Sequence, residues 1–175
     1  RTDIDGTAMM GEVIGQLQSV LDLPLQRDSS HPEVIEAGLR IYNGKPIVNS
    51  VNGELEVLQR ILPLVKKYGA AVVGLTMDKN GIPETAEERL EIGKRIVAAC
   101  AAYGIPKEDV YLDWLTLTVS VQQKEALETL KAVRLVKEQL GVKTVLGVSN
   151  ISFGLPDREV INTTFLTLAM EAGLD

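Results

Sequence analysis

Val145-Leu146-Gly147-Val148-Ser149-Asn150 is a short apolar run that ends in polar residues, and three other stretches of the chain end in the same way. These stretches are Leu25-Gln26-Arg27-Asp28, Pro46-Ile47-Val48-Asn49 and Val110-Tyr111-Leu112-Asp113. Longer segments with a helical period separate the runs, which predicts an α/β fold with a parallel sheet covered by helices. Parallel strands linked by helices end at one face of the sheet, so two carboxylates and two carboxamides are expected to converge there.

Five strand–helix units are predicted along the chain. Strands are expected at 23–27, 46–49, 71–76, 110–113 and 144–148, and helices at 7–20, from 30, at 54–68, from 85, at 121–140 and at 158–172. Ser30 with Glu33, and Thr85 with Glu88, match the capping box that satisfies free amides of a first helical turn. Pro63 is expected to break or kink its helix because proline has no amide proton.

The composition is that of an ordinary soluble globular chain, with 45% hydrophobic and 24% charged residues and a net charge of -6. No basic stripe is present, so nucleic acid is not an expected partner. No apolar run approaches the roughly 20 residues of a membrane helix, and the first residues lack the features of a signal peptide. We therefore expect a cytoplasmic protein without membrane contact. One cysteine, Cys100, and one histidine, His31, cannot form a closed zinc site, so no metal is expected.

Residues 1–175 are expected to form a single domain, because no linker rich in Pro, Gly or Ser divides them. The domain is nevertheless expected to be incomplete at both ends. The eight units of a closed barrel take about 250 residues, and this chain starts without Met and stops directly after a predicted helix. Five strands leave an open sheet with two unpaired edges, through which copies of the chain can associate as a homo-oligomer.

Asp113 is the most informative polar residue at the strand ends, because a carboxylate after Val-Tyr-Leu is costly to bury without a donor. The adjacent N–H groups of a pterin or a guanine offer it two parallel hydrogen bonds, each contributing about 1.5 to 3 kcal/mol. Asn49 and Asn150 both donate and accept, which suits a neutral heterocycle. Other interpretations stay open: Asp28 or Asp113 can cap the segment that follows it, and either amide can order a loop.

Five motifs of the chain recur in the same order in pterin-binding methyltransferases: Asp28-Ser29-Ser30, Ile47-Val48-Asn49-Ser50, Gly74-Leu75-Thr76-Met77, Leu112-Asp113 and Leu146-Gly147-Val148-Ser149-Asn150-Ile151-Ser152. The chain resembles the pterin-binding (folate) barrel of cobalamin-dependent methionine synthase. It is similarly close to methyltetrahydrofolate:corrinoid iron-sulfur protein methyltransferase, with which it shares the stretch from Pro156-Asp157-Arg158 through Ala172-Gly173-Leu174-Asp175. The likeness spans nearly the whole chain, and the ordered set is more specific than any one motif.

The resemblance implies a TIM (β/α)8 barrel of the pterin-binding type, of which this chain carries about five units, the third to the seventh strands. Strands one, two and eight would be missing. Six positions of this sequence are expected to bind the substrate: Asp28, Asn49, Asp113, Ser149, Asn150 and Arg158. In the family, residues like the first three hold the pterin ring and an Asn like Asn150 reaches the N5 region. Ser149 and Arg158 match positions near the same loop.

By the same resemblance, the expected reaction moves a methyl group from N5 of the substrate 5-methyltetrahydrofolate to the Co(I) atom of a corrinoid. The corrinoid-ligating Asp-x-His-x-x-Gly motif is absent, so the cobalamin or other corrinoid is expected on another domain or protein. The amine leaves poorly unless N5 is protonated or hydrogen-bonded as the methyl group departs. Asn150 and Asp113 are the expected catalytic residues, with Asn150 acting at N5 and Asp113 mainly in binding. Whether the methyl acceptor is an in-chain cobalamin domain or a separate corrinoid protein stays open.

Two alternatives to this methyltransferase remain. A dihydropteroate synthase has a similar pterin pocket, but it would need a sequence of the Ser-Arg-Lys type after the seventh strand, where this chain has Ser149-Asn150-Ile151. A non-catalytic pterin-binding or assembly fragment would bind little folate by itself and would associate through its exposed strand edges.

Overall fold

Five parallel strands form one sheet in the computed structural model, which describes residues 5–175. The strands are β1 (Gln26–Asp28), β2 (Ile47–Val51), β3 (Ala71–Leu75), β4 (Val110–Asp113) and β5 (Lys143–Val145). They lie in the order β1-β2-β3-β4-β5, so each strand pairs with its neighbour in sequence. Because parallel crossovers are right-handed, strictly sequential strands place their connecting helices on one side of the sheet, as in the wall of a barrel.

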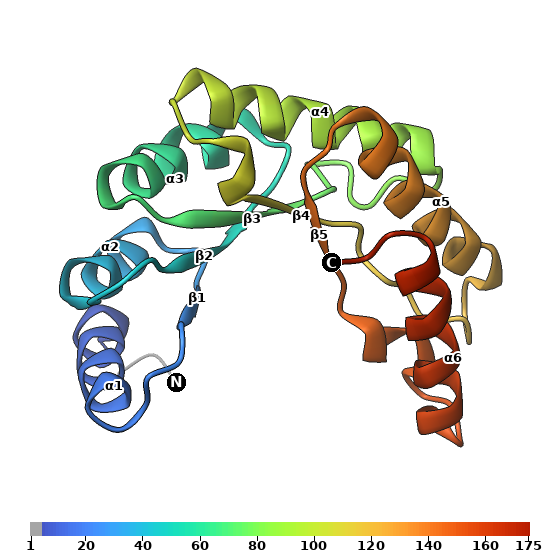
Figure 1. Cartoon of the computed structure of the whole chain (residues 1–175), viewed down its shortest axis with the longest axis horizontal. Helices are drawn as coiled ribbons and strands as arrows, with labels where there is room; N and C mark the ends of the chain where they lie inside the picture. Colours follow the sequence, from blue (N-terminus) through green and yellow to red (C-terminus); the bar gives the residue numbers. More distant parts are fainter. Residues whose placement is uncertain (1–4) are drawn as a thin grey trace.

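Between residues 5 and 175, six helices accompany the strands: α1 (Gly6–Val20), α2 (Pro32–Ile41), α3 (Leu55–Tyr68), α4 (Ala86–Ala102), α5 (Gln123–Gln139) and α6 (Arg158–Glu171). Two short 3-10 helices, η1 (Lys107–Asp109) and η2 (Val148–Ser152), precede β4 and follow β5. Figure 1 shows the sheet bent into an arc, with α1 to α5 along its convex side and α6 at the red end of the chain. The concave side corresponds to the interior of a barrel.

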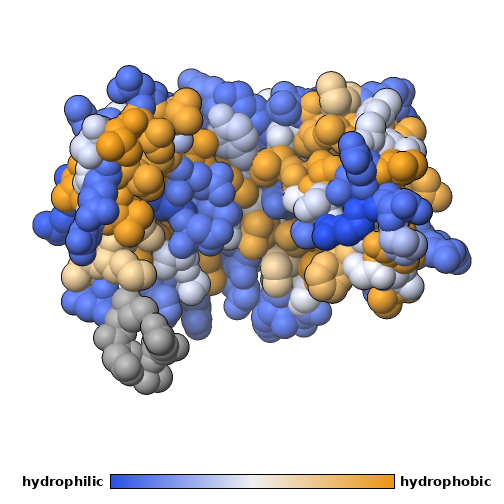
Figure 2. All heavy atoms as spheres, turned by 90° about the horizontal axis from the view of Figure 1, so that it is seen from below, coloured by the Kyte–Doolittle hydropathy of each residue, from blue (hydrophilic) through white to orange (hydrophobic). Residues whose placement is uncertain are grey.

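The core lies between the sheet and the helices. Val48, Val72 and Leu112 of the three central strands are fully buried there, in one cluster with Leu62 of α3 and Ile96 of α4. Side chains alternate along a strand, so the neighbouring positions face the concave side. Figure 2 looks at the molecule from below and shows hydrophobic and polar surface interleaved on that face. The helix side of the sheet thus carries the packing, and the concave side is free to carry polar groups.

The strand register places the polar strand-end residues along one edge. Asp28 pairs with Asn49 across β1 and β2, and Asp113 pairs with Leu75 of β3 and Val145 of β5. All five strands run in the same direction, so this edge is the carboxyl end of the whole sheet.

The two predicted capping boxes have different outcomes. Thr85 is the N-cap of α4: its side chain accepts from the Glu88 amide, and the Glu88 carboxylate accepts from the Thr85 amide, as predicted. At α2 the N-cap is His31, with no side-chain cap bond, so the capping box predicted for Ser30 is wrong. His31 precedes Pro32, which disfavours a helical backbone at His31, and it is extended (φ -100°, ψ 114°). The helix therefore starts one residue too late for Ser30 to be its N-cap, and Ser29 Oγ accepts a hydrogen bond from the His31 amide at 3.1 Å.

Other local predictions also have mixed outcomes. α3 runs through Pro63 without a break, because Pro63 lies on the exposed side of the helix, where water can bond the carbonyl that loses its amide partner. Gly104, predicted as the left-handed residue after α4, has a φ of 70°. The last strand is shorter than predicted, since the chain enters η2 at Val148.

Within residues 5–175, every helix is too short or too polar to cross a membrane.

Candidate functional site

The candidate site begins with a hydrogen-bonded pair formed by the last residue of β1 and the central residue of β2. Asn49 Nδ2 donates to Asp28 Oδ2 at 3.2 Å. This bond orients the Asn49 amide, because its nitrogen faces the carboxylate and its oxygen Oδ1 points away from it. Asp28 is exposed and Asn49 is half-buried. The pair therefore presents carbonyl and carboxylate oxygens to a ligand that carries N–H groups.

Asp113, the last residue of β4, is held at its side chain and its main chain. Oδ1 accepts from the Leu115 amide at 2.9 Å, and the backbone carbonyl accepts from the amide and hydroxyl of Thr76 at 3.0 and 2.9 Å. Burial raises the pKa of the Asp113 carboxyl above its ordinary value, and the Leu115 bond opposes that shift. The cap interpretation is thus confirmed for Oδ1, whereas Oδ2 accepts no hydrogen bond within residues 5–175.

A cavity of about 320 Å³ opens beside Asp28 at the ends of β1, β2 and β3. It is lined by the polar residues Asp28, Ser29, Ser30, Ser50 and Asn52 and by the apolar residues Val51, Val57, Ile61, Leu75 and Met77. Sequence reasoning did not select the serines as site residues, although each follows Asp28 or Asn49 within two positions. Asn49 and Asp113 do not line this cavity, so Asp28 is the one predicted site residue in its lining.

The turn after β2 fits closely against the loop after β3. Gly53 N donates to Met77 O at 2.8 Å, and a Cβ at Gly53 would lie 2.7 Å from Ile92 Cγ2 and 3.2 Å from Met77 O. Only glycine allows this approach. Asn52 is fixed too, since its Oδ1 accepts from the Glu54 amide and its Nδ2 donates to Glu54 Oε1, both at 2.9 Å. These contacts hold one rim of the cavity.

The η2 segment carries Ser149 and Asn150, whose side chains are exposed. The Asn150 amide lies over Gly147, where an added Cβ would be 2.7 Å from Asn150 Nδ2. Arg158, the first residue of α6, donates from Nη2 to Ser149 O at 2.9 Å and from Nε to Ser152 Oγ at 3.0 Å. Arg158 is therefore an anchor of the η2 backbone, and its direct contact with substrate stays a prediction.

The structure brings some of the predicted residues into contact and spaces out the others. Asp28 and Asn49 touch, whereas Asp113 lies two strands beyond Asn49, at about 4.8 Å per strand. Asn150 follows β5, at the far end of the arc (Figure 1). A ligand that contacts all four must extend across the concave side of the carboxyl edge. No three His, Cys, Asp or Glu side chains within residues 5–175 are grouped so that they can hold a metal ion.

Comparison with known proteins relates the chain to enzymes of folate chemistry. A family model described as "Pterin binding enzyme" matches residues 3–175. Methionine synthases of Mycobacterium leprae and Mycobacterium tuberculosis are each 38% identical over 184 residues, which cover 98% of this chain. The methylcorrinoid:tetrahydrofolate methyltransferase of Eubacterium limosum is 30% identical over 162 residues, 91% of this chain. The chain spans 15% of the length of the two synthases and 60% of the length of the methyltransferase.

Solved structures of dihydropteroate synthases share the fold. The Clostridium difficile enzyme superposes with a TM-score of 0.75 and 20% identity, over 98% of this chain and 68% of that chain. The Yersinia pestis enzyme gives a TM-score of 0.73 and 15% identity, over 96% and 66%. At these identities the likeness concerns the fold alone. It confirms the predicted architecture, an α/β chain with about five strand–helix units of a pterin-binding barrel.

Proposed function

Since the chain belongs to the family of pterin-binding enzymes, we propose that it binds 5-methyltetrahydrofolate at the carboxyl edge of its sheet. There it serves the transfer of the N5 methyl group to a corrinoid held by another domain or protein. The observation that carries this proposal is the set of acceptors along one edge, the Asp28–Asn49 pair and the half-buried Asp113 carboxylate. The names of the relatives favour a methyltransferase over other pterin enzymes.

Asp113 and Asn49 divide the recognition of the ring. Asp113 Oδ2 accepts an N–H from the 2-amino edge of the pterin, and a charge-assisted bond of this kind contributes about 1.5 to 3 kcal/mol. Asn49 Oδ1 points away from Asp28 and accepts a second N–H. Asp28 acts through Asn49, because without its carboxylate the amide is free to turn over and offer a donor instead.

Asn150 acts at N5, where the bond to the methyl carbon breaks. N5 keeps the electron pair of that bond and gains a proton, so a group that stabilises the protonated amine lowers the barrier. Asn150 has no useful pKa, but its Oδ1 can accept the N5 proton in a hydrogen bond. Its side chain is exposed and lies over Gly147, and we expect it to turn towards the ring when the substrate binds. A corrinoid supplies the Co(I) nucleophile that accepts the methyl group.

Calorimetric titration with 5-methyltetrahydrofolate tests the binding part of the proposal. The wild-type chain is expected to bind saturably, and Asp113→Asn is expected to bind at least about tenfold more weakly, since one charge-assisted bond is lost. Asp22→Asn is a matched control, because Asp22 is exposed and lies before β1, at the opposite edge of the sheet. Circular dichroism verifies that each variant is folded. Equal affinities of the wild type and Asp113→Asn would contradict the proposal.

If the folded chain gives no binding signal, the same titration is made with a longer polypeptide that includes this chain. Binding there would show that flanking sequence completes the site, and no binding would contradict the proposal.

Steady-state kinetics test the role of Asn150. Asn150→Ala is expected to lower kcat more than it raises KM for 5-methyltetrahydrofolate, because the N5 contact strengthens as the methyl group leaves. The reverse pattern would assign Asn150 to ground-state binding.

A dihydropteroate synthase is the second candidate, because solved enzymes of that name share the fold of this chain. The residues after β5 argue against it, because η2 has Ser149-Asn150-Ile151 where a Ser-Arg-Lys sequence is expected. Formation of a pteroate from 4-aminobenzoic acid by this protein would support this candidate over the methyltransferase.

A further inference from the structure

Arg89, in the first turns of α4, joins segments that are far apart in the sequence. Its side chain is fully buried. Nε donates to Pro83 O at 2.8 Å, and Nη1 donates to Trp114 O at 2.9 Å and to Thr129 Oγ1 at 3.0 Å. Nη2 pairs with the Glu125 carboxylate of α5. The planar guanidinium thus ties the loop after β3, the end of β4 and the start of α5 into one cluster.

The Trp114 carbonyl connects this cluster to the candidate site. Trp114 directly follows Asp113, and the next residue, Leu115, gives its amide to Asp113 Oδ1. Leu115 has a φ of 57°, a left-handed conformation that is unfavourable for a residue with a branched side chain. The bond from Arg89 to Trp114 O therefore holds the chain in the conformation in which the Leu115 amide reaches the carboxylate.

We propose that Arg89 is a positioning residue that fixes the Asp113 carboxylate for pterin binding by holding the Trp114 carbonyl. The inference rests on the proposed function, because it takes Asp113 as the ring-binding residue. Glu125 and Thr129 hold the guanidinium in turn, and Thr129 Oγ1 also donates to Glu125 O at 2.9 Å. Arg89 touches no ligand; it acts through the backbone that follows Asp113.

The chemistry of the cluster favours positioning over simple stabilisation. A buried ion pair is a weak source of stability, because the desolvation of both charges offsets most of their attraction. Apolar side chains of similar volume often fill such a space equally well. Apolar side chains cannot bond the carbonyls of Pro83 and Trp114 together, however, and the fork of Arg89 does so. What the ion pair adds, beyond stability, is therefore a fixed position for the carbonyl groups of Pro83 and Trp114.

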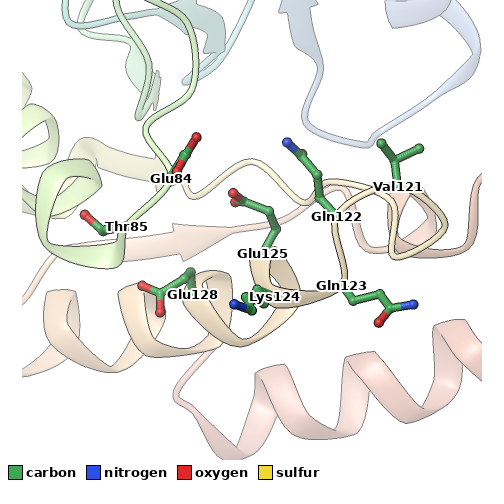
Figure 3. Close-up of a pocket in the computed structure, with 8 residues that line it drawn as sticks. All are labelled: Glu84, Thr85, Val121, Gln122, Gln123, Lys124, Glu125 and Glu128. Carbon is green, nitrogen blue, oxygen red and sulfur yellow. The ribbon is translucent and has the colours of Figure 1, made fainter.

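A cavity of about 560 Å³ lies beside this ion pair. Figure 3 shows Glu84 of the β3–α4 loop and Glu125 of α5 directed into the same space. Glu128, one turn further along α5, accepts the Ala86 amide of α4 at 2.7 Å. None of the predicted site residues lines this cavity, so the cluster reaches the pterin site through the main chain alone.

The test replaces the buried pair by apolar side chains in the whole polypeptide, as the double variant Arg89→Met/Glu125→Leu. It is expected to keep a melting temperature near that of the wild type and to bind 5-methyltetrahydrofolate about tenfold more weakly. The matched control is Arg134→Met/Glu171→Leu, which removes an exposed ion pair between α5 and α6 and is expected to bind like the wild type.

Nuclear magnetic resonance of the Leu115 amide supplies a readout that does not depend on ligand. Its proton resonance is expected to move in Arg89→Met/Glu125→Leu and to stay in place in the control, because only the first pair holds the Trp114 carbonyl. Wild-type affinity or an unmoved Leu115 resonance in the folded double variant would overturn the inference.

Thr129→Val decides the question if the double variant does not fold. This nearly isosteric change removes the hydroxyl that accepts from Arg89 Nη1, and it is expected to weaken binding and to move the Leu115 resonance. Wild-type behaviour in both measurements would overturn the inference. Failure of the wild-type polypeptide to bind 5-methyltetrahydrofolate would overturn the proposed function and the inference with it. Binding by the wild type together with unchanged variants would overturn the inference about Arg89 alone.

Discussion

Two buried arginines lie near the proposed ring-binding residues, and their side chains have different hydrogen-bond partners. Arg27 directly precedes Asp28 and is 1% exposed, whereas Arg89 supports the residue after Asp113 and is 0% exposed. Arg89 donates to a carboxylate, a hydroxyl and two carbonyls. No side-chain nitrogen of Arg27 has a hydrogen-bond partner within residues 5–175, and its guanidinium stacks on the Tyr42 ring at 4.2 Å.

Different forces therefore fix the two sides of the candidate site. Burial lowers the pKa of both guanidinium groups, and Glu125 opposes this shift at Arg89. A hydrogen-bond network in which every donor has a partner, as at Arg89, fixes one side-chain conformation. Packing and stacking, as at Arg27, restrict the side chain but leave its orientation less sharply defined. We therefore expect Asp113 to be preorganised for the ring and Asp28 to adjust when ligand binds.

The largest expected effect is that of Arg89→Met alone. The change leaves the Glu125 carboxylate buried without its partner, which costs about 3 to 5 kcal/mol of unfolding free energy. Urea denaturation measures this loss. Arg134→Met, at an exposed ion pair, serves as the control and is expected to change stability little. A loss for Arg89→Met as small as that of the control would remove the distinction between the two arginines.

The second prediction concerns pH at the well-fixed side. Burial raises the pKa of Asp113 in the folded chain, so the ionised carboxylate costs stability above that pKa and the cost disappears as pH falls through it. Under the proposed function, ligand binding has the opposite dependence, because the proposed contact with the ring needs the ionised carboxylate. As the pH is lowered, the affinity for 5-methyltetrahydrofolate should therefore begin to fall at a higher pH than it would with an aspartate of ordinary pKa.

Calorimetric titrations at several pH values measure this dependence, and Asp113→Asn is the control. The variant is expected to bind weakly at every pH, and its affinity should not show the decrease that protonation of Asp113 causes in the wild type. The same decrease of affinity in both proteins would mean that another group, not Asp113, is protonated.

The third prediction concerns the weakly satisfied side, at Arg27. Arg27→Met removes a desolvated charge that has no hydrogen-bond partner among the described residues, and the gain exceeds the lost stacking on Tyr42. The variant is expected to be more stable than the wild type by about 1 to 2 kcal/mol in urea denaturation. A destabilisation comparable to that of Arg89→Met would mean that Arg27 has an equally strong partner.

The smallest expected effects are at the helix starts beside each arginine. Thr85→Ala removes the cap of α4 and is expected to cost about 1 kcal/mol. Ser30→Ala, before α2, is expected to stay within about 0.5 kcal/mol, because Ser30 caps no amide. Equal losses of stability in Thr85→Ala and Ser30→Ala, measured by thermal unfolding, would show that both side chains cap their helices.

The features predicted correctly from sequence are those with short-range causes. Apolar runs ending at Asp28 and Asp113 mark strand ends because burial on both faces of a parallel sheet requires such runs. The strand end predicted at Asn49 is wrong, since β2 continues to Val51. Thr85 with Glu88 is read correctly because both partners lie within one turn. Ser30 has the same spacing to Glu33 but is not a cap, since Pro32 keeps His31 extended and the helix begins one residue later.

The features that sequence reasoning missed depend on long-range contacts. Nothing near Arg89 indicates its bonds to Trp114, 25 positions away, or to Glu125, 36 positions away. Arg158 was expected at the substrate, and only the folded chain reveals its bonds to Ser149 and Ser152. Periodicity and motifs specify which face a residue occupies, but they do not specify its partner on that face.

The turn at Asn52-Gly53 has a consequence for the chemical ageing of the protein. Asn-Gly sequences deamidate readily when the glycine nitrogen is free to attack the asparagine side-chain carbonyl and close a succinimide ring. Here the Gly53 amide is committed to Met77 O, and both ends of the Asn52 carboxamide are bonded to Glu54. Ring closure requires those bonds to break, so the folded protein should keep Asn52 intact long after the unfolded chain has lost it.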